Sequence, residues 1–251
     1  MIDFHTHILP QIDDGAQNLD TSLEMLNKER SQGVEKVVFT PHYYGRQFSP
    51  QQFLEKRAEA FERLRPLIPE GMKTRLGAEV YFTGVNVPDY EQLCALAIEG
   101  TEYILIEFPF NNGWTGQMFE KLSEFINDTG YTPIIAHIER YNEIWRKPAL
   151  VNELTKMGCL LQVNARAFFD KRDRKLALPL LKHGFVHCIG SDAHDVTGRP
   201  PNMEQTKKAF YQAGLDVEWE YAQEMMRKVL ANERVFVHTT RPLRKIFGMY
   251  F

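Results

Sequence analysis

Cysteine is scarce in this sequence, and its few positions exclude the chemistry that depends on paired thiols. Only three cysteines occur among 251 residues, Cys94, Cys159 and Cys188, and none of them forms a Cys-x-x-Cys pair. An odd number without that spacing argues against a disulfide framework and against a thiolate metal site. Because all three lie in apolar runs, we expect buried free thiols.

Long apolar runs and a surplus of basic residues are also missing. Nowhere do eighteen apolar residues follow one another, so the sequence predicts no membrane-spanning helix. The formal net charge of −3 argues against a nucleic-acid partner, since such proteins usually concentrate basic residues on one face. The first residues lack the basic, apolar and small-residue regions of a signal peptide, and a cytoplasmic protein is therefore expected.

No linker, low-complexity segment or internal repeat divides the chain, because glycine and proline are scattered as single interruptions. A chain of 251 residues with 43% apolar content can bury one large core. Barrels of this size are commonly one domain, so we predict a single domain over residues 1–251.

Short β-rich runs alternate with helical patterns, which is typical of parallel β/α units. Seven strands are predicted, at Ile2–His5, Val34–Thr40, Lys73–Glu79, Tyr103–Phe108, Thr132–His137, Cys159–Asn164 and Val186–Gly190. Between the first two, Leu19, Leu23 and Leu26 fall on one helical face and Gly33 follows as a stop. The pattern predicts an α/β fold, a (β/α)7 TIM-like barrel, with an open doubly wound sheet as the alternative.

Residues that can bind metal ions recur where the predicted strands end. The alternation in Asp3-Phe4-His5-Thr6-His7 is that of a strand, so His5 and His7 project from one face about 7 Å apart. The C-terminal ends of parallel strands meet on one side of the sheet, and side chains there converge. Six of the seven predicted ends carry a candidate ligand: His5 with His7, His42, Glu79, Glu107, His137, and Asp192 with His194.

Each candidate has an ordinary structural explanation when it is taken alone. A single histidine after a strand is more often structural, and a single glutamate is more often solvated. Buried charges at six strand ends, however, are costly unless a cation compensates them, which favours a multinuclear metal site. Asp14 is a ninth candidate, although Asp-Gly is also a turn signal and either Asp13 or Asp14 could reach the site. His183, His187 and His238 lack this placement, so we expect surface or core histidines there.

Seven motifs, in order along the chain, carry a family resemblance. They are His5-x-His7, Asp14-Gly15, Thr40-Pro41-His42, Gly77-Ala78-Glu79, Leu105-Ile106-Glu107-Phe108, Ala136-His137-Ile138-Glu139-Arg140-Tyr141 and Ser191-Asp192-Ala193-His194. Together they resemble the PHP (polymerase and histidinol phosphatase) superfamily. More narrowly, they are similar to the manganese-dependent bacterial tyrosine phosphatases of capsule and exopolysaccharide operons, the CpsB/CapC type.

This resemblance implies a (β/α)7 barrel with three clustered ions, usually Mn²⁺, at the C-terminal strand ends. Its implied ligands are His5, His7, Glu79 and Asp192 for the first ion, Glu79, Glu107 and His137 for the second, and Asp14, His42 and His194 for the third. Imidazole and carboxylate donors also suit iron or zinc. The implied reaction is attack by metal-bound hydroxide on phosphotyrosine, in the C-terminal tail of a membrane-associated tyrosine kinase that controls polysaccharide export.

Two arginines and two tyrosines lie beside the candidate ligands. Arg140 and Arg199 carry guanidinium forks that match phosphate oxygens, and surface ion pairs are the alternative for each. The family pattern associates both positions with phosphate binding, which implies a catalytic and substrate-binding role. Tyr43 and Tyr44 follow His42 and could form an aromatic mouth for the substrate, or could simply pack.

Other classes of protein share parts of this pattern. A histidinol-phosphate-type phosphatase of the same superfamily would use every one of these ligands on a small alkyl phosphate. Deaminases of the amidohydrolase type also begin with His-x-His, but they commonly need a strand-borne lysine, and no lysine occupies these strand ends. A binding module that retains the metal-site fold without catalysis is the third alternative.

The cysteine pattern generates the first testable prediction. A phosphocysteine mechanism requires Cys-x5-Arg, whereas Gly100, Ala165 and His194 stand sixth after the three cysteines. Replacing all three cysteines should therefore leave turnover of p-nitrophenyl phosphate nearly unchanged, even if thermal stability falls. Loss of turnover after replacement of one cysteine, in a variant with normal folding and metal content, would refute a thiol-independent mechanism.

Overall fold

Parallel strands surround a common axis in the computed structural model, which describes residues 1–83, 89–110, 113–235, 242–246 and 249–250. The strands are β1 (Ile2–Thr6), β2 (Lys36–Phe39), β3 (His42–Tyr43), β4 (Lys73–Leu76), β5 (Glu79–Tyr81), β6 (Tyr103–Glu107), β7 (Thr132–Ile135), β8 (Leu160–Asn164) and β9 (Cys188–Gly190). They occupy seven positions because β2 continues into β3, and β4 into β5, after a short break. β2 pairs with β4 and β3 pairs with β5, so both breaks fall at the same level.

The strand order shows how the sheet curls. One part runs β1-β2-β4 and the other β3-β5-β6-β7-β8-β9. Where β9 reaches β1, the Asp192 N–H donates to the His5 carbonyl at 2.8 Å and the His7 N–H donates to the Ala193 carbonyl at 2.9 Å. These bonds bring the last strand back to the first. The predicted TIM-like α/β barrel is thereby confirmed in preference to the open sheet.

The predicted strands recur with small differences. Every residue of β1, β6 and β8 is buried, as expected of parallel strands covered on both faces. The predicted strand Lys73–Glu79 is broken at Gly77-Ala78, where the Gly77 carbonyl accepts a hydrogen bond from the buried Arg57 guanidinium. The break turns the chain just before Glu79 and so determines where that carboxylate points.

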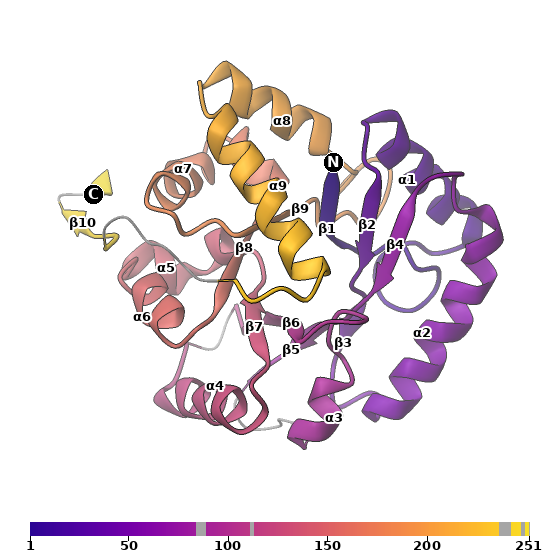
Figure 1. The fold of residues 1–251 in the computed structure, drawn as a ribbon, viewed down its shortest axis with the longest axis horizontal. Helices are drawn as coiled ribbons and strands as arrows, with labels where there is room; N and C mark the ends of the chain where they lie inside the picture. Colours follow the sequence, from indigo (N-terminus) through magenta and orange to yellow (C-terminus); the bar gives the residue numbers. More distant parts are fainter. Residues whose placement is uncertain (84–88, 111–112, 236–241, 247–248, 251) are drawn as a thin grey trace.

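Helices cover the outside of the strands (Figure 1). They are α1 (Leu19–Ser31), α2 (Pro50–Leu64), α3 (Tyr90–Cys94), α4 (Gly116–Thr129), α5 (Asn142–Arg146), α6 (Leu150–Lys156), α7 (Arg174–Lys182), α8 (Met203–Gln212) and α9 (Asp216–Leu230), with 3-10 turns η1 (Arg65–Leu67), η2 (Ile138–Arg140) and η3 (Ala165–Phe168). Ser49 and Gln52 form a capping box at the start of α2, and Gly130 ends α4 in the left-handed conformation. In the described part of the chain, no helix combines the length and apolarity needed to cross a bilayer.

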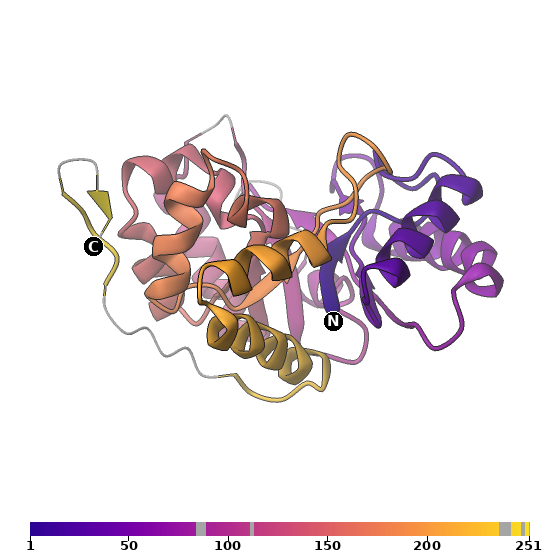
Figure 2. The same cartoon turned by 90° about the horizontal axis from the view of Figure 1, so that it is seen from above.

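Helix α9 packs at the N-terminal end of the barrel. The Gln223 side-chain carbonyl accepts the Ile2 N–H at 2.9 Å, and the Met226 sulfur accepts the Ile189 N–H at 3.4 Å. Figure 2 shows α9 beneath the strands, while the loops that follow the strands gather on the other side. The C-terminal strand ends are therefore left for a functional site.

The cysteines occupy the positions expected of structural thiols. All three are free, Cys159 and Cys188 are buried, and Cys94 is half-buried. Burial raises the pKa of the Cys159 and Cys188 thiols, which keeps them protonated and poorly nucleophilic.

Barrel closure generates the second prediction. A Cβ at Gly190 would clash with the His5 Cβ and lie 2.7 Å from the His5 nitrogen, so Gly190→Ala must push β9 away from β1. Overpacking of this kind costs about 1–3 kcal/mol of unfolding free energy. Gly116→Ala is the matched control, since no atom lies within 4 Å of its added Cβ, and should change stability by less than about 0.5 kcal/mol. Urea denaturation measures both, and equal stabilities would contradict the tight β1–β9 contact.

Candidate metal centre

The nine predicted ligands meet at the C-terminal end of the barrel. His5 comes from β1, Glu107 from β6, and His42 and Glu79 begin β3 and β5, whose pairing places the two side by side. His7, Asp14, His137, Asp192 and His194 lie in loops that follow strands. Asp14 is 66% exposed, whereas the other eight side chains are buried or nearly so. Two of these, His137 and Asp192, have left-handed backbones (φ 32° and 55°), a strained conformation often found at functional sites.

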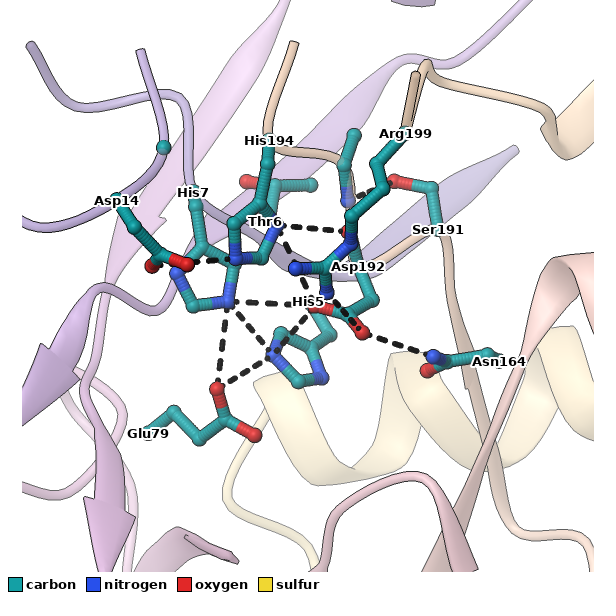
Figure 3. A network of polar contacts seen from close by, with 12 residues as sticks. His5, Thr6, His7, Asp14, Glu79, Asn164, Ser191, Asp192, His194 and Arg199 are labelled. Carbon is teal, nitrogen blue, oxygen red and sulfur yellow. Dashed lines mark hydrogen bonds and ion pairs between the residues drawn. The ribbon is translucent and has the colours of Figure 1, made fainter. Parts of the chain in front are cut away.

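The first group consists of His5, His7, Glu79 and Asp192, whose ligand atoms all lie within 4.8 Å of one another (Figure 3). His5 Nε2 lies 3.2 Å from Glu79 Oε2 and 3.6 Å from Asp192 Oδ1. His7 Nε2 lies 3.3 Å and 3.4 Å from the same two oxygens. Two imidazoles and two carboxylates thus surround one point.

The other groups extend this cluster on either side of Glu79 and His42. His137 Nε2 lies 2.7 Å from Glu79 Oε1 and 3.4 Å from Glu107 Oε1, and His42 Nδ1 lies 3.0 Å from Glu79 Oε2. His7, Asp14, His42 and His194 form the third group. The geometry brings all the expected members together, and it adds His42 to the second group and His7 to the third.

The two imidazoles of the first group are oriented so that a cation fits between them. His5 Nδ1 lies 3.2 Å from the Gln162 side-chain carbonyl, and His7 Nδ1 lies 2.6 Å from Asp13 Oδ2. These acceptors assign the proton of each neutral ring to Nδ1. The two Nε2 atoms then face each other at 3.1 Å, an arrangement that is repulsive unless a proton or a metal cation lies between them. Buried Glu79 Oε2 and His194 Nε2 likewise lack a hydrogen-bond partner among the described residues.

The ionisation of these groups shows how much negative charge is gathered here. Burial alone would lower the pKa of His137, but the Glu107 and Glu79 carboxylates raise this pKa to about 9. Burial opposes ionisation of Glu79, yet the His5 and His42 rings hold its pKa well below the usual range. Protons therefore occupy this centre where metal ions would otherwise bind, and the two compete. Oxygen and imidazole donors without thiolates fit Mn²⁺, iron or zinc.

Three further residues hold the ligands in place, and the motifs did not assign them this role. Asp13 Oδ2 accepts from His7 Nδ1 and, at 2.8 Å, from the His42 N–H. Gln162 accepts from His5 and from the His137 N–H, and Asn164 Nδ2 donates to Asp192 Oδ2 at 2.8 Å. Such outer partners fix ring tautomers and ligand orientation. The sequence did contain one sign of this role, because Gln162 and Asn164 are polar residues two positions apart in an otherwise apolar strand.

The choice between Asp13 and Asp14 is decided by this geometry. Asp14 Oδ1 lies 3.4 Å from His194 Nε2 and 3.6 Å from His42 Nε2, within reach of the third group. Asp13 lies behind His7 and supports it from the Nδ1 side. Asp14 is therefore the candidate ligand of the two.

A second buried carboxyl pair, Asp3 and Glu29, lies below the site. Asp3 Oδ1 accepts the Ser191 N–H at 2.8 Å and so supports the loop that carries Asp192. Burial, and then the charge of Asp3, raise the pKa of Glu29 well above its usual range. Glu29 therefore holds a proton in the folded protein.

Arg140 and Arg199 both contact the outer oxygen of Asp192. Arg140 Nη1 lies 3.1 Å and Arg199 Nη2 lies 2.7 Å from Asp192 Oδ2, while Oδ1 faces the histidines. The arginine side chains are 38% and 39% exposed, so their remaining N–H groups are accessible. Asp195 accepts the backbone N–H groups of Thr197, Gly198 and Arg199, which fixes the Arg199 loop.

The two predicted tyrosines occupy different places. Tyr44 stacks on His42 with ring centroids 5.1 Å apart, at the edge of the metal centre. Tyr43 is only 2% exposed and packs against Phe53, so a substrate contact by Tyr43 is not supported. Neighbouring residues of a strand point to opposite faces, which is why only one of the two reaches the site.

His187, one of the histidines that were not expected to be ligands, has a structural role in the core. His187 is buried, its Nδ1 accepts the Leu161 N–H at 2.9 Å, and burial lowers its pKa to about 4. It is a neutral core histidine, as expected. His183 is partly exposed at the end of α7, and His238 lies outside the described residues.

Comparison with known proteins places the chain in a family. The sequence model of the family described as "Capsular polysaccharide synthesis, CpsB/CapC" matches residues 1–234. The tyrosine-protein phosphatase YwqE of Bacillus subtilis (strain 168) is 31% identical, with 100% of both chains covered. The putative tyrosine-protein phosphatase CapC of Staphylococcus aureus is 32% identical, over 94% of this chain and 93% of the relative.

Solved structures give the same result. One from a study of YwqE from Bacillus subtilis and CpsB from Streptococcus pneumoniae, described as unique metal-dependent tyrosine phosphatases, superposes with a TM-score of 0.80. It is 25% identical and covers 98% of this chain and 100% of the solved one. A TatD-like protein from Archaeoglobus fulgidus, 14% identical, covers 90% and 100% with a TM-score of 0.54, and shares the fold.

The curled parallel sheet, the buried cluster of histidines and carboxylates, and these relatives define a PHP-like, metal-dependent tyrosine-protein phosphatase. Within that class, the chain belongs to the CpsB/CapC family of capsular polysaccharide synthesis.

The cluster generates the third prediction, in which two buried glutamates are compared. Glu79→Gln should lower bound metal and reduce kcat by about 100-fold or more, because Glu79 contacts ligands of all three groups. Glu29→Gln is the matched control, since Glu29 is already neutral in the folded protein. Elemental analysis and p-nitrophenyl phosphate turnover measure both effects. Equal metal content and turnover in the two variants would contradict the central position of Glu79.

Proposed function

We propose that this protein hydrolyses phosphotyrosine in the C-terminal tail of a membrane-associated bacterial tyrosine kinase that regulates capsular or exopolysaccharide synthesis. The family description and the tyrosine-phosphatase names of its relatives support this assignment. The observation that carries it is the position of Asp192, which faces the metal centre with one oxygen and two arginines with the other. A phosphate bound beside Asp192 would contact both the metal centre and the two arginines.

We further propose that three Mn²⁺ ions occupy the groups around Glu79, with iron or zinc as chemically compatible substitutes. His5, His7, Glu79 and Asp192 would hold the first ion. The others would be held by Glu79, Glu107 and His137 with His42, and by Asp14, His42 and His194 with His7. When bound, such ions supply a nucleophile at neutral pH and stabilise charge on the phosphoryl oxygens.

The residues of the chain itself would bind and orient the phosphate. Arg140 and Arg199 have accessible N–H groups beside Asp192, and a guanidinium fork matches two phosphate oxygens. The Arg140 guanidinium also lies 4.7 Å from the centre of the Phe110 ring, which itself stacks on His137. This packing holds Arg140 in place, so that little side-chain entropy is lost when phosphate binds.

Aromatic side chains on the opposite side of the centre favour an aryl substrate. A cavity of about 390 Å³ beside Asp14 and His42 is lined by Tyr44 and Phe48. A phenyl ring can stack there while its phosphate lies at the metal centre. A phenol with pKa near 10 also leaves more readily than an alkyl alcohol, which reduces the need for a general acid.

A histidinol-phosphate-type phosphatase is the alternative function, because it would use the same ligands. The Tyr44 and Phe48 cavity favours a phenolic ester over a small alkyl phosphate. We also propose that residues 1–251 act as one domain. Leu243 is buried, and its backbone exchanges hydrogen bonds with the Asn152 side chain on α6.

Substrate preference is the fourth prediction. Phosphotyrosine peptides should exceed phosphoserine peptides and histidinol phosphate in kcat/KM by at least about tenfold, which corresponds to about 1.4 kcal/mol of transition-state stabilisation. Arg199→Ala should lower kcat/KM for every ester, whereas Tyr44→Ala should mainly reduce the aryl preference. Tyr43→Phe is the control and should leave the preference intact. A wild-type preference for histidinol phosphate would overturn this function and leave the metal centre standing.

A further inference from the structure

A second cavity of about 390 Å³ adjoins the metal centre on the side of Asp192, away from Tyr44. Four guanidinium groups line it. Arg140 and Arg199 have been described above, Arg166 comes from η3, and Arg172 comes from the loop before α7. Neither Arg166 nor Arg172 belongs to the motifs that carry the metal ligands, and both side chains are exposed.

These two arginines have no carboxylate partner in the part of the chain that the structure describes. Among the described residues, no hydrogen bond or ion pair involves the Arg166 guanidinium, and Arg172 lies over the Trp145 ring at 5.6 Å. The nearby Asp170 carboxylate accepts the backbone N–H groups of Arg172 and Asp173 at 2.8 and 3.1 Å. These backbone bonds order the loop and, together with the more distant charges of Arg166 and Arg172, lower the pKa of Asp170.

Four acidic residues also line the cavity, namely Glu139, Asp170, Asp173 and Asp192. Asp192 faces the metal centre, and the buried Glu139 accepts the Asn164 N–H at 3.2 Å, so both carboxylates have partners other than Arg166 and Arg172. Burial and Asp170 raise the pKa of Asp173, while Arg172, Arg140 and Arg166 oppose that rise. The exposed guanidinium groups of Arg166 and Arg172 therefore keep N–H groups for an anion that enters the cavity.

We propose that Arg166 and Arg172 form a subsite for a second anionic group of the polypeptide substrate, close in sequence to the phosphotyrosine that is hydrolysed. The subsite rests on the proposed function, since it extends the binding of a phosphotyrosine polypeptide. A carboxylate of Asp or Glu and the phosphate of a second phosphotyrosine share the required chemistry, because both accept N–H groups of a guanidinium fork. The subsite selects phosphotyrosines with acidic neighbours over isolated ones.

The test measures inhibition constants (Ki) of phosphotyrosine peptides against p-nitrophenyl phosphate hydrolysis by the metal-loaded enzyme. The peptides carry Glu, Gln or a second phosphotyrosine on either side of the central phosphotyrosine. Wild type should bind the Glu peptide about fivefold more tightly than the Gln peptide, the effect expected of two exposed ion pairs. The second-phosphotyrosine arm shows whether phosphate or carboxylate is preferred. Added salt should reduce either preference.

Reversing the charge of Arg166 and Arg172 tests whether these two residues cause the preference for the Glu peptide. Arg166→Glu/Arg172→Glu should invert the preference, so that the Gln peptide binds more tightly, an outcome that general loss of stability would not produce. Arg174→Ala/Lys175→Ala is the matched control, because it removes two exposed charges from the neighbouring first turn of α7 and should retain the preference. Equal Ki values for the Glu and Gln peptides in wild type, or an unchanged preference in the reversed variant, would overturn the subsite.

The same assay separates this inference from the proposed function. If the enzyme failed to hydrolyse phosphotyrosine peptides but still bound the Glu peptide more tightly, the proposed function would fail and the subsite would stand. If the enzyme hydrolysed both peptides but bound them with equal Ki values, the proposed function would stand and the subsite would fail.

Discussion

Repulsion among acidic oxygens and imidazole lone pairs at one end of the barrel is the constraint on which this structure depends. Glu79 is its centre, since its two oxygens lie within 3.3 Å of His5, His7, His42 and His137. So many ligand atoms at such distances are stable only if protons or metal cations lie among them. Metal binding and folding of this end of the barrel are therefore coupled.

The rest of the fold holds these ligands against that repulsion. The close approach of β1 and β9 at Gly190 sets His5 beside the Asp192 loop, and Asp3 supports that loop from below. Asp13 and Gln162 fix the protons of the two histidine rings on the outer nitrogens. Asp192 then divides the site, with the metal centre on one side and the arginines on the other.

The seven strand positions and the cluster of candidate ligands could be predicted from sequence because both are local. A strand ends where its apolar run ends, and a ligand there needs no knowledge of the partner strand. Contacts between distant segments were not accessible: Gln223 meets Ile2 across 221 residues, and α8 and α9 carry no motif that would show where they pack. The roles of Gln162 and Asn164 depend on which face of β8 lies inside, and so does the difference between Tyr43 and Tyr44. Strand alternation separates the two tyrosines once the site face is known.

The most direct test of a cation-balanced centre is an anomalous difference map from crystals of the protein loaded with Mn²⁺. Three peaks are expected, one within each ligand group and all within coordinating distance of Glu79, His42 or His7. The absence of any peak near Glu79, in a crystal that shows this barrel with its ligands in place, would contradict the account.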